Sequence, residues 1–253
     1  MTKISVITAV YNGDKYIRET VESVLAQKGD FELEYIICDG QSSDRTLEIL
    51  DEYKDSCKII SRKDSGPQEA INYGMNLATG DIACWLNADD IFTPGSLDMV
   101  VKAFKKYPER RWLYGKSYIM NSEGKEIRKL VTLYKNIIGF FYSWNILLCE
   151  NFINQPSTFW KRDLWNEVKD LNPEYKAAWD YELWLNMALK SRPIHLRKNL
   201  SVFRRHVSSI SENNFEKQFD EELAIARQHC NFIHYMFHAF NRWKTVSIYK
   251  LLS

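Results

Sequence analysis

The sequence predicts an α/β fold: a central mixed, mostly parallel, Rossmann-like sheet flanked by helices, with a C-terminal helical tail. Three observations predict this class. Short β-rich runs alternate with helical patterns over residues 1–120, as in right-handed βαβ units of a parallel sheet. Charged residues make up 26% and hydrophobic residues 45% of the 253 positions, which is typical of a globular rather than a disordered chain. From Asn213 onward the pattern is helical again.

The first half of the chain gives strands and helices in regular alternation. The expected strands are the β-rich runs Ile4–Val10, Glu34–Cys38, Lys58–Ser61 and Ile82–Leu86. Between and after them, apolar residues recur at helical spacing, and turn or capping residues precede each helix. These helices are expected to begin near Asp14, Asp44, Pro67 and Pro94.

After residue 110 the pattern changes. Asn121–Gly124 has the composition of a hairpin turn, and we expect strands over Trp112–Met120 and Glu126–Tyr134 on either side of it. A helix is expected over Ala178–Leu189 and an extended segment over Ile194–Arg204. One mixed domain over residues 1–211, followed by a helical extension over residues 212–253, is therefore the predicted organisation.

The charge balance excludes one class of partner. The chain has 34 Lys and Arg against 33 Asp and Glu, a net charge of +1, whereas dedicated nucleic-acid binders show a basic excess. The N-terminus lacks the pattern of a signal peptide. The five cysteines are odd in number and contain no CxxC pair, which is typical of reduced thiols. We therefore expect a cytoplasmic protein with no nucleic-acid partner.

Acidic residues follow the expected strands of the first half. Asp39 follows the second strand, Asp64 the third, and Asp89 and Asp90 the fourth. Ligand sites of such sheets lie beyond the carboxyl ends of the strands, so these acids should share one edge. Adjacent carboxylates suit Mg²⁺ or Mn²⁺, although a solvated turn also explains this motif alone. No GxGxxG or GxxxxGK[ST] phosphate loop is present, so metal and basic side chains would have to hold any nucleotide phosphates.

Four further residues carry chemistry that has two interpretations. Asp180 opens an expected helix, where capping is its ordinary role and general base catalysis the functional one. Arg204 and Arg205 could neutralise a diphosphate or form a solvated strand end. His206 beside them is, taken alone, more often structural than a ligand.

Several short motifs occur in a fixed order along the chain. They are Ser5–Asn12, Asp39–Thr46, Asp64–Gly74, Ala78–Asp81, Trp85–Asp90, Asn154–Trp160, Trp179–Leu185 and Phe203–His206. Together they closely resemble the family 2 glycosyltransferases with a GT-A fold, over residues 3–211. Each motif alone is weak, but their number and order make a chance match improbable.

This resemblance implies an inverting transfer of a sugar from a nucleotide-diphosphate sugar to a hydroxyl group. Residues 1–110 would be the nucleotide-binding half and residues 111–211 the acceptor-binding half of a GT-A catalytic domain. Asp180 would be the catalytic base, and Asp89, Asp90 and His206 would bind Mn²⁺ or Mg²⁺. The donor-binding residues implied are Thr8, Val10, Asn12, Asp39, Asp64, Asn72, Asn87, Asp89 and Arg204, and the acceptor-binding residues are Gln155 and Trp179. Asp39 matches the aspartate that reads the base, which makes a UDP-sugar the favoured donor.

The chain departs from the family pattern at three positions. Asn87 replaces the first acid of a strict DxD motif, which leaves less negative charge for a metal. Tyr73 stands where a basic residue is frequent. Trp179 replaces the acid that often precedes the base.

Two alternatives to a glycosyltransferase remain open. A nucleotidyltransferase that makes nucleotide sugars would need a Gly-rich phosphate segment near the N-terminus, and Ala9–Gly13 does not supply one. A non-catalytic nucleotide-sugar binder or assembly protein would have no need of Asp180. We therefore expect a metal-dependent enzyme that acts on a saccharide or lipid-linked acceptor in cell-surface polysaccharide biosynthesis.

The C-terminal extension shows one aromatic helix face. Its residues follow helical spacing: Phe232, Tyr235, Met236, Ala239, Phe240 and Trp243. Residues 223–253 contain four basic residues and no acid. We favour packing of this face on the catalytic domain or on another subunit. The alternative is peripheral contact with an anionic membrane, at the inner face of the cell membrane.

Overall fold

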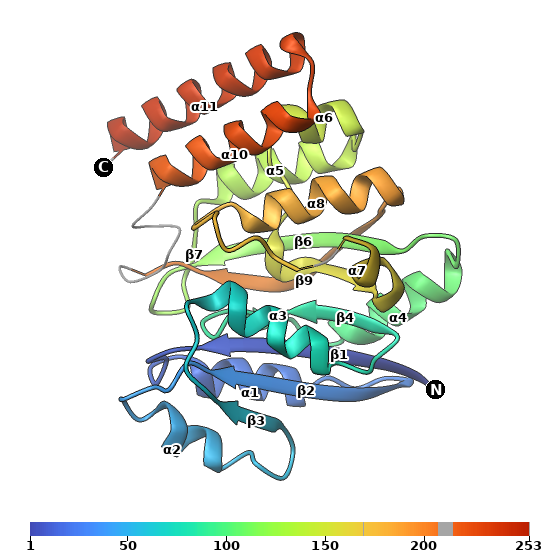
Figure 1. The fold of residues 1–253 in the computed structure, drawn as a ribbon, viewed down its shortest axis with the longest axis vertical. Coiled ribbons are helices and arrows are strands. Elements are labelled where there is room, and N and C mark those ends of the chain that lie inside the picture. The colour runs from blue at the N-terminus through green and yellow to red at the C-terminus, as the bar shows by residue number, and fades with distance from the viewer. Residues whose placement is uncertain (169, 207–214, 253) are drawn as a thin grey trace.

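A nine-stranded mixed sheet forms the centre of the fold in the computed structural model, which describes residues 1–168, 170–206 and 215–252 (Figure 1). The strands are β1 (Thr2–Val10), β2 (Phe31–Asp39), β3 (Lys58–Ser61), β4 (Ile82–Trp85), β5 (Ile91–Phe92), β6 (Trp112–Met120), β7 (Glu126–Ile127), β8 (Thr158–Lys161) and β9 (Ile194–Arg204). The helices are α1 (Ile17–Leu25), α2 (Thr46–Asp51), α3 (Pro67–Leu77), α4 (Ser96–Lys106), α5 (Lys129–Phe140), α6 (Trp144–Cys149), α7 (Arg162–Val168), α8 (Trp179–Lys190), α10 (Phe215–His229) and α11 (Phe232–Leu252), with a 3₁₀ turn η1 (Gln155–Ser157).

The strand order is β3-β2-β1-β4-β8-β6-β9-β5, and β7 pairs with β6. The β1–β2, β2–β3, β1–β4 and β6–β9 pairs are parallel, which confirms the predicted mixed, mostly parallel α/β sheet. Val10 is opposite Asp39, and Asp39 is opposite Ser61. Because β1, β2 and β3 end level with one another, the loops that follow them lie side by side.

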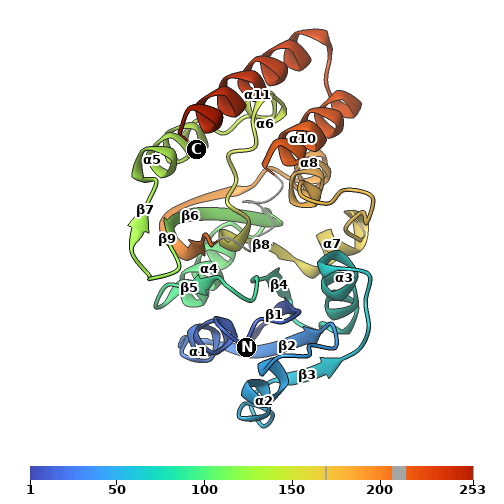
Figure 2. The ribbon, with the colours of Figure 1, turned by 90° about the vertical axis from the view of Figure 1, so that its left-hand side faces the viewer.

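Helices cover both faces of the sheet, as the alternating pattern predicts. Figure 2 shows α1 and α4 on one side of the sheet and α3 and α7 on the other. The buried apolar residues accordingly form two clusters. One contains residues of α1, α2 and α4, and the other contains residues of α3, α6, α7, α8 and α10.

A cluster of fully buried tryptophans joins the second cluster to the sheet. Trp184 of α8 stacks between Trp85 of β4 and Trp112 of β6, with ring centroids 5.8 and 6.2 Å apart and interplanar angles of 7° in both pairs. Trp184 is therefore a core residue.

Replacing Trp184 by alanine is expected to lower the free energy of unfolding by about 3–5 kcal/mol, because it leaves a cavity between two rings. The Trp184 indole N–H has no hydrogen-bond partner among the described residues. Trp184→Phe, which removes that donor, should therefore cost less. Urea denaturation measures both, with Leu189→Ala on the exposed side of α8 as the control. Equal effects of Trp184→Ala and Leu189→Ala would contradict the prediction.

The predicted strand over Glu126–Tyr134 is wrong beyond its first two residues. The hairpin itself is present, since β6 and β7 pair across the Asn121–Gly124 turn. After it, Arg128 has a left-handed backbone (φ 52°) and α5 begins at the next residue. Apolar residues then recur at Leu130, Leu133 and Ile137. This spacing is helical rather than alternating, so the segment continues as a helix.

The C-terminal extension is helical, and α10 packs on α8 while α11 packs on α6. The predicted boundary between residues 211 and 212, and the first residues of the predicted helical stretch, lie outside the described residues. The expectation that the aromatic face of α11 packs on the catalytic domain is wrong, because Met236, Phe240 and Trp243 are exposed. The physical reason is that α11 is held through its polar face, as described below. In the described part of the chain, no helix is long and apolar enough to cross a membrane.

Candidate active site

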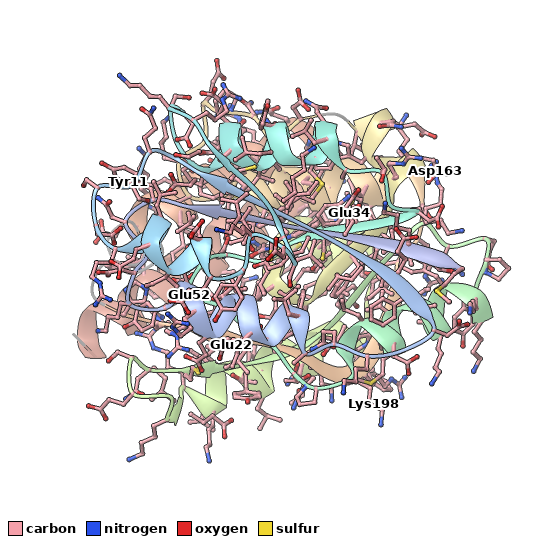
Figure 3. The ribbon with its side chains drawn as sticks, turned by 90° about the horizontal axis from the view of Figure 1, so that it is seen from below. Tyr11, Glu22, Glu34, Glu52, Asp163 and Lys198 are labelled. Carbon is pink, nitrogen blue, oxygen red and sulfur yellow. The ribbon has the colours of Figure 1, made fainter. Side chains whose placement is uncertain are left out.

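One edge of the sheet gathers the loops that carry the predicted site residues. In Figure 1 the arrowheads of β1 and β2 and the start of α8 lie toward the left-hand side. Figure 3 shows Tyr11, which follows β1, at that same end of the molecule, and Asp163 at the opposite end. A cleft of about 500 Å³ opens at the carboxyl ends of β1 to β3, within the size range of small-molecule sites. It is lined by Ala9, Val10, Tyr11, Gly40, Gln41, Lys63, Asp64, Gly66, Pro67 and Ala70.

Hydrogen bonds from backbone N–H groups to side chains tie the loop after β1 to the loop after β2. Asn12 N–H donates to Ser42 Oγ (2.8 Å), and Ser43 N–H donates to Asn12 Oδ1 (2.8 Å). Asn12 and Gln41 both have positive φ angles, of 50° and 63°. Such conformations cost free energy and persist where surrounding contacts over-determine them. Asn12 therefore shapes the rim of the cleft.

Asp39, the last residue of β2, holds the loop that follows this strand. Its side chain is fully buried and accepts hydrogen bonds from Gln41 N–H (3.0 Å), Ser42 N–H (3.2 Å) and Ser61 Oγ–H (2.6 Å). Thr8, buried beneath it in β1, shares a hydrogen bond with the Tyr35 hydroxyl. Asp39 therefore stabilises the loop after β2, and Thr8 joins β1 to β2.

Asp64 brings a carboxylate to the cleft wall. Burial raises its pKa above the ordinary value, although the Gly66 N–H donates to Asp64 Oδ1 (3.0 Å). A Cβ at Gly40 would lie 2.9 Å from Asp64 Oδ2, so a larger residue there would displace the Asp64 carboxylate. Lys63 lines the same cleft and supplies positive charge. The cleft is therefore lined by one acidic side chain (Asp64), one basic side chain (Lys63) and the exposed ring of Tyr11.

The loop after β4 is held by a polar network. Asn87 Nδ2 donates to Asp90 Oδ2 (3.0 Å) and to Gln155 Oε1 (3.1 Å), while Gln155 Nε2 donates to the Trp85 carbonyl (2.9 Å). Asp90 is fully buried, and its Oδ1 accepts from the Arg204 N–H (2.9 Å). Burial and the neighbouring Asp89 carboxylate raise the pKa of Asp90. The structure thus gives Asp90 the part of joining the β4 loop to β9.

Asp89 and His206 face each other across the same loop. Asp89 Oδ2 lies 2.9 Å from His206 Nε2, and the His206 ring lies 4.8 Å from that of Tyr16. Among the described residues, no group of three or more His, Cys, Asp or Glu side chains is placed to hold a metal ion. One carboxylate and one imidazole nonetheless fit a divalent ion of the Mg²⁺ or Mn²⁺ kind. Such ions are often held by few protein ligands and complete their shell with substrate phosphates and water.

Arg204 does not reach the cleft as an open cation. Its side chain is 3% exposed, forms an ion pair with Glu19 and donates from Nε to the Asp89 carbonyl (2.9 Å). The guanidinium also lies 4.6 Å from the Tyr16 ring centre. Arg204 therefore fixes the Asp89 backbone from below.

Asn72 and Trp179 are both associated with the start of α8. The Asn72 amide exchanges two hydrogen bonds with the backbone of Leu171, at 2.8 and 2.9 Å, and so anchors the loop before α8. Trp179, at the first position of α8, packs partly buried against the core. Gln155 lies with the β4 loop network rather than beside α8.

Asp180 is the second residue of α8 and partly buried. Burial raises its pKa to about 6, against an opposing hydrogen bond from the Tyr181 N–H and the positive charge of Lys135. An acid with this pKa is largely ionised at neutral pH and is still basic enough to accept a proton. The helix start predicted for Asp180 is thus confirmed.

Sequence patterns did not reveal two acids on α10 that surround Asp180. The Glu221 carboxylate accepts hydrogen bonds from the N–H groups of residues 176, 177 and 178, just before α8. Glu222 is buried, accepts from Asn151 Nδ2 and Gln218 Nε2 (both 3.1 Å), and has its pKa raised to about 7, mainly by burial and also by Asp180. Neither acid belongs to a recognisable motif, and only the packing of α10 on α8 brings them here.

If Asp180 is the catalytic base that the resemblance implies, its raised pKa predicts an acidic limb in the pH–rate profile. A base must be deprotonated, so the rate of the step that it serves should fall about tenfold per pH unit below about pH 6. Measuring kcat across the acidic and neutral range tests this prediction. Glu222→Gln, which removes the other buried acid near Asp180, should keep the limb. A profile that stays flat down to pH 5 would contradict the assignment.

Comparison with known proteins decides the family. Residues 5–167, more than half of the chain, match the family model described as glycosyl transferase family 2. The chain belongs to this family. The matched range includes the cleft, the β4 loop and η1, and it ends before α8, α10 and α11.

Curated relatives are longer than this chain. It is 24% identical over 221 residues to an uncharacterized glycosyltransferase of Rickettsia felis, covering 86% of this chain and 36% of that protein. It is 27% identical over 207 residues to a chondroitin synthase of Escherichia coli, covering 77% of this chain and 28% of that protein. The chain thus spans about a third of the length of these relatives.

Solved structures show the same fold at low sequence identity. S. aureus TarS in complex with UDP-GlcNAc aligns with a TM-score of 0.68 and 20% identity over 88% of this chain and 66% of that one. The mannosyltransferase PcManGT from Pyrobaculum calidifontis, in complex with GDP-Man and Mn²⁺, aligns with a TM-score of 0.69 and 16% identity over 91% and 65%. The chain therefore has a GT-A fold.

Proposed function

We propose that the protein transfers a sugar, with inversion, from a nucleotide-diphosphate sugar to a hydroxyl of a saccharide or lipid-linked acceptor. One observation carries this proposal. Asp180, a partly buried carboxylate whose pKa is raised to about 6, is the second residue of α8. The start of α8 lies toward the same side of the molecule as the arrowheads of β1 and β2 (Figure 1), and the cleft is lined by residues that follow those strands. A base and a site for a leaving diphosphate on one edge are what a single displacement requires.

The proposed reaction assigns a separate task to each end of the site. Asp180 accepts the proton of the acceptor hydroxyl. At the same time the hydroxyl oxygen of the acceptor attacks the anomeric carbon of the donor sugar, and the bond from that carbon to the diphosphate breaks. The departing diphosphate carries negative charge, which fixed positive groups stabilise in the transition state. Asp89 and His206 would hold Mn²⁺ or Mg²⁺, and such an ion neutralises diphosphate charge when bound. Asp90, which the resemblance also implies as a metal ligand, is left out of the proposed ion site because it is fully buried and joins this loop to β9.

The cleft at β1 to β3 is proposed to take the nucleoside of the donor. Tyr11 is 65% exposed and offers a ring face, while Asp64 and Lys63 offer an acceptor and a donor. We favour a UDP-sugar because Asp39 matches the base-reading aspartate of the family. TarS with UDP-GlcNAc and PcManGT with GDP-Man support a nucleotide sugar as the donor class. The similarity to chondroitin synthase supports a role in polysaccharide biosynthesis.

A thermal-shift screen of UDP-, GDP- and dTDP-sugars, each with and without Mn²⁺, tests the donor and the metal together. Stabilisation by one donor class, larger with Mn²⁺, is the expected result, because a ligand that binds only the folded state raises its melting temperature. Transfer of the sugar to a saccharide or lipid-linked acceptor should then follow with inverted stereochemistry. Donor binding without transfer to any acceptor would point to a binding protein instead. We propose that the reaction takes place in the cytoplasm, at the inner face of the cell membrane.

A further inference from the structure

Helices α5 and α11 expose the largest apolar side chains outside the site. Leu130, Ile137 and Phe140 point outward from α5, and Phe237, Phe240 and Trp243 from α11, and all six are exposed. The two helices meet where Lys244 Nζ donates to the Tyr134 hydroxyl (3.2 Å). We call these six residues the apolar surface. Exposed apolar patches of this kind mark interaction sites.

Helix α11 contacts the rest of the protein through polar side chains on its inward face, which leaves its apolar side chains exposed. His238 is buried and its Nδ1 lies 2.8 Å from the Leu148 carbonyl, while Asn241 Nδ2 donates to the Cys149 carbonyl (3.1 Å). These are carbonyls of the last turn of α6, which have no partners within their own helix. A helix that docks through His238 and Asn241 keeps its aromatic side outward.

The basic side chains around the apolar surface favour an anionic partner. Neither α5 nor α11 contains an acidic residue. The acids in contact with these helices include Glu126, which pairs with Lys129 (3.4 Å), and Glu150, which accepts from the Tyr134 hydroxyl (2.8 Å). Lys129 and Lys244 belong to these helices, and the exposed Arg197 guanidinium of β9 lies 4.0 Å from the Phe140 ring centre. A symmetric dimer through this surface would place cations of one copy against those of the other, since both copies present the same patch. An anionic bilayer would take up the aromatic side chains at its headgroup boundary and attract the basic side chains through its lipid phosphates.

We propose that the apolar surface of α5 and α11 lies on an anionic lipid bilayer, with both helices parallel to it. Aromatic and aliphatic side chains would enter the headgroup boundary while Lys129, Arg197 and Lys244 pair with lipid phosphates. The inner side of α5 carries Lys135, whose charge acts on Asp180. The bilayer would therefore lie close to the proposed base, where a lipid-linked acceptor would enter; this last step rests on the proposed function.

Vesicle co-sedimentation of the whole chain tests the proposal without any sugar transfer. The wild-type protein should pellet with vesicles of phosphatidylcholine and phosphatidylglycerol, less with phosphatidylcholine alone, and be released by salt. The double variant Phe237→Ser, Phe240→Ser should lose at least about tenfold in vesicle affinity, because each exposed ring contributes buried area. Leu189→Ser, which changes an apolar side chain of equal exposure (59%) on α8, should bind as the wild type does.

Two results would overturn the proposal. In one, the wild-type protein stays in the supernatant with anionic vesicles. In the other, light scattering shows a dimer that becomes a monomer in the double variant while vesicle binding is absent. The second result would assign the apolar surface to a second copy.

A separate observation concerns the loop before Asp180. One carboxylate, that of Glu221, accepts four hydrogen bonds of 2.8–3.1 Å from the N–H groups of Lys176, Ala177 and Ala178. Ala178 is the N-terminal cap residue of α8, so the Glu221 carboxylate fixes the turn that leads into this helix. Charge-assisted hydrogen bonds of this kind are among the stronger ones.

We infer that Glu221 is a positioning residue for Asp180, an inference that rests on the proposed function. Asp180 follows the clamped N–H groups by two residues, so the direction of its carboxylate depends on how this turn is held. The C-terminal extension would thereby complete the active site, although it lies outside the range matched by the family model. Loose support of a catalytic group costs rate even where every catalytic residue is present.

Glu221→Gln tests this role, with Glu174→Gln as a control of equal charge change on an exposed residue of the same loop. Glu221→Gln should lower kcat about tenfold at unchanged donor KM and move the acidic limb of the pH–rate profile, whereas Glu174→Gln should do neither. Glu221→Asp should restore part of kcat. Normal kcat and an unmoved limb in Glu221→Gln would overturn the inference. Absence of transfer by the wild-type protein would instead overturn the proposed function.

Discussion

Asp180→Asn is expected to lower kcat for sugar transfer by about 10²–10⁴-fold, the usual contribution of a positioned general base. The amide is nearly isosteric with the carboxylate, and it cannot accept the proton of the acceptor hydroxyl. Donor binding should be preserved, because the cleft at β1 to β3 does not include Asp180. Steady-state kinetics and donor thermal shifts, measured on the same preparation, separate the two effects.

The same substitution should stabilise the fold at neutral pH. The pKa of Asp180 rises from 3.8 to about 6 on folding, so its ionisation opposes folding above pH 6, while below about pH 4 the acid is protonated in both states. The melting temperature of Asp180→Asn should therefore exceed that of the wild type at pH 7.5 and match it near pH 4. Asp163→Asn, an exposed acid at the opposite end of the molecule (Figure 3), should change neither kcat nor stability. Near-normal transfer by Asp180→Asn would remove the base from the proposed mechanism.

The first half of the fold follows from local patterns in the sequence. β-rich runs bounded by turns gave β3 its bounds, and Pro67 marked the start of α3, because proline fits the first turn of a helix. Parallel pairing of level strands then brings Asp39 and Asp64 to one edge. The α5 segment was mispredicted because a turn and two strand-like residues precede it, and the helical spacing appears only further along.

Residue types alone could not separate open side chains from buried ones at the site. Asp89 and Asp90 are neighbours in sequence, yet one faces His206 and the other is fully buried against β9. Arg204 looks like a phosphate ligand in sequence but is paired with Glu19 from α1. These differences arise from long-range packing, which no local pattern encodes. The same holds for Glu221, whose partners lie over 40 positions earlier in the chain.

Asp89→Asn is expected to abolish the Mn²⁺-dependent part of the donor thermal shift and to lower kcat by about 10²–10³-fold, the range seen when one stabilising contact to developing charge is lost. The Asp89 carboxylate is partly exposed, and its contact with His206 Nε2 at 2.9 Å can open toward a cation. His206→Ala should weaken the Mn²⁺ response in the same direction. The readout of donor binding with and without the ion does not depend on turnover.

Asp90→Asn provides the matched control, because it makes the same chemical change one residue away. Asp90 accepts from the Arg204 N–H at Oδ1 and from Asn87 Nδ2 at Oδ2. An asparagine can keep only one of these acceptors and places a donor against a donor at the other. We expect a loss of about 1–3 kcal/mol in the free energy of unfolding, as for a buried polar group left unpaired, with the Mn²⁺ response of donor binding retained. If instead Asp90→Asn lost the Mn²⁺ response and Asp89→Asn kept it, the ion would be bound through the buried acid, and the proposed division of labour in this loop would be reversed.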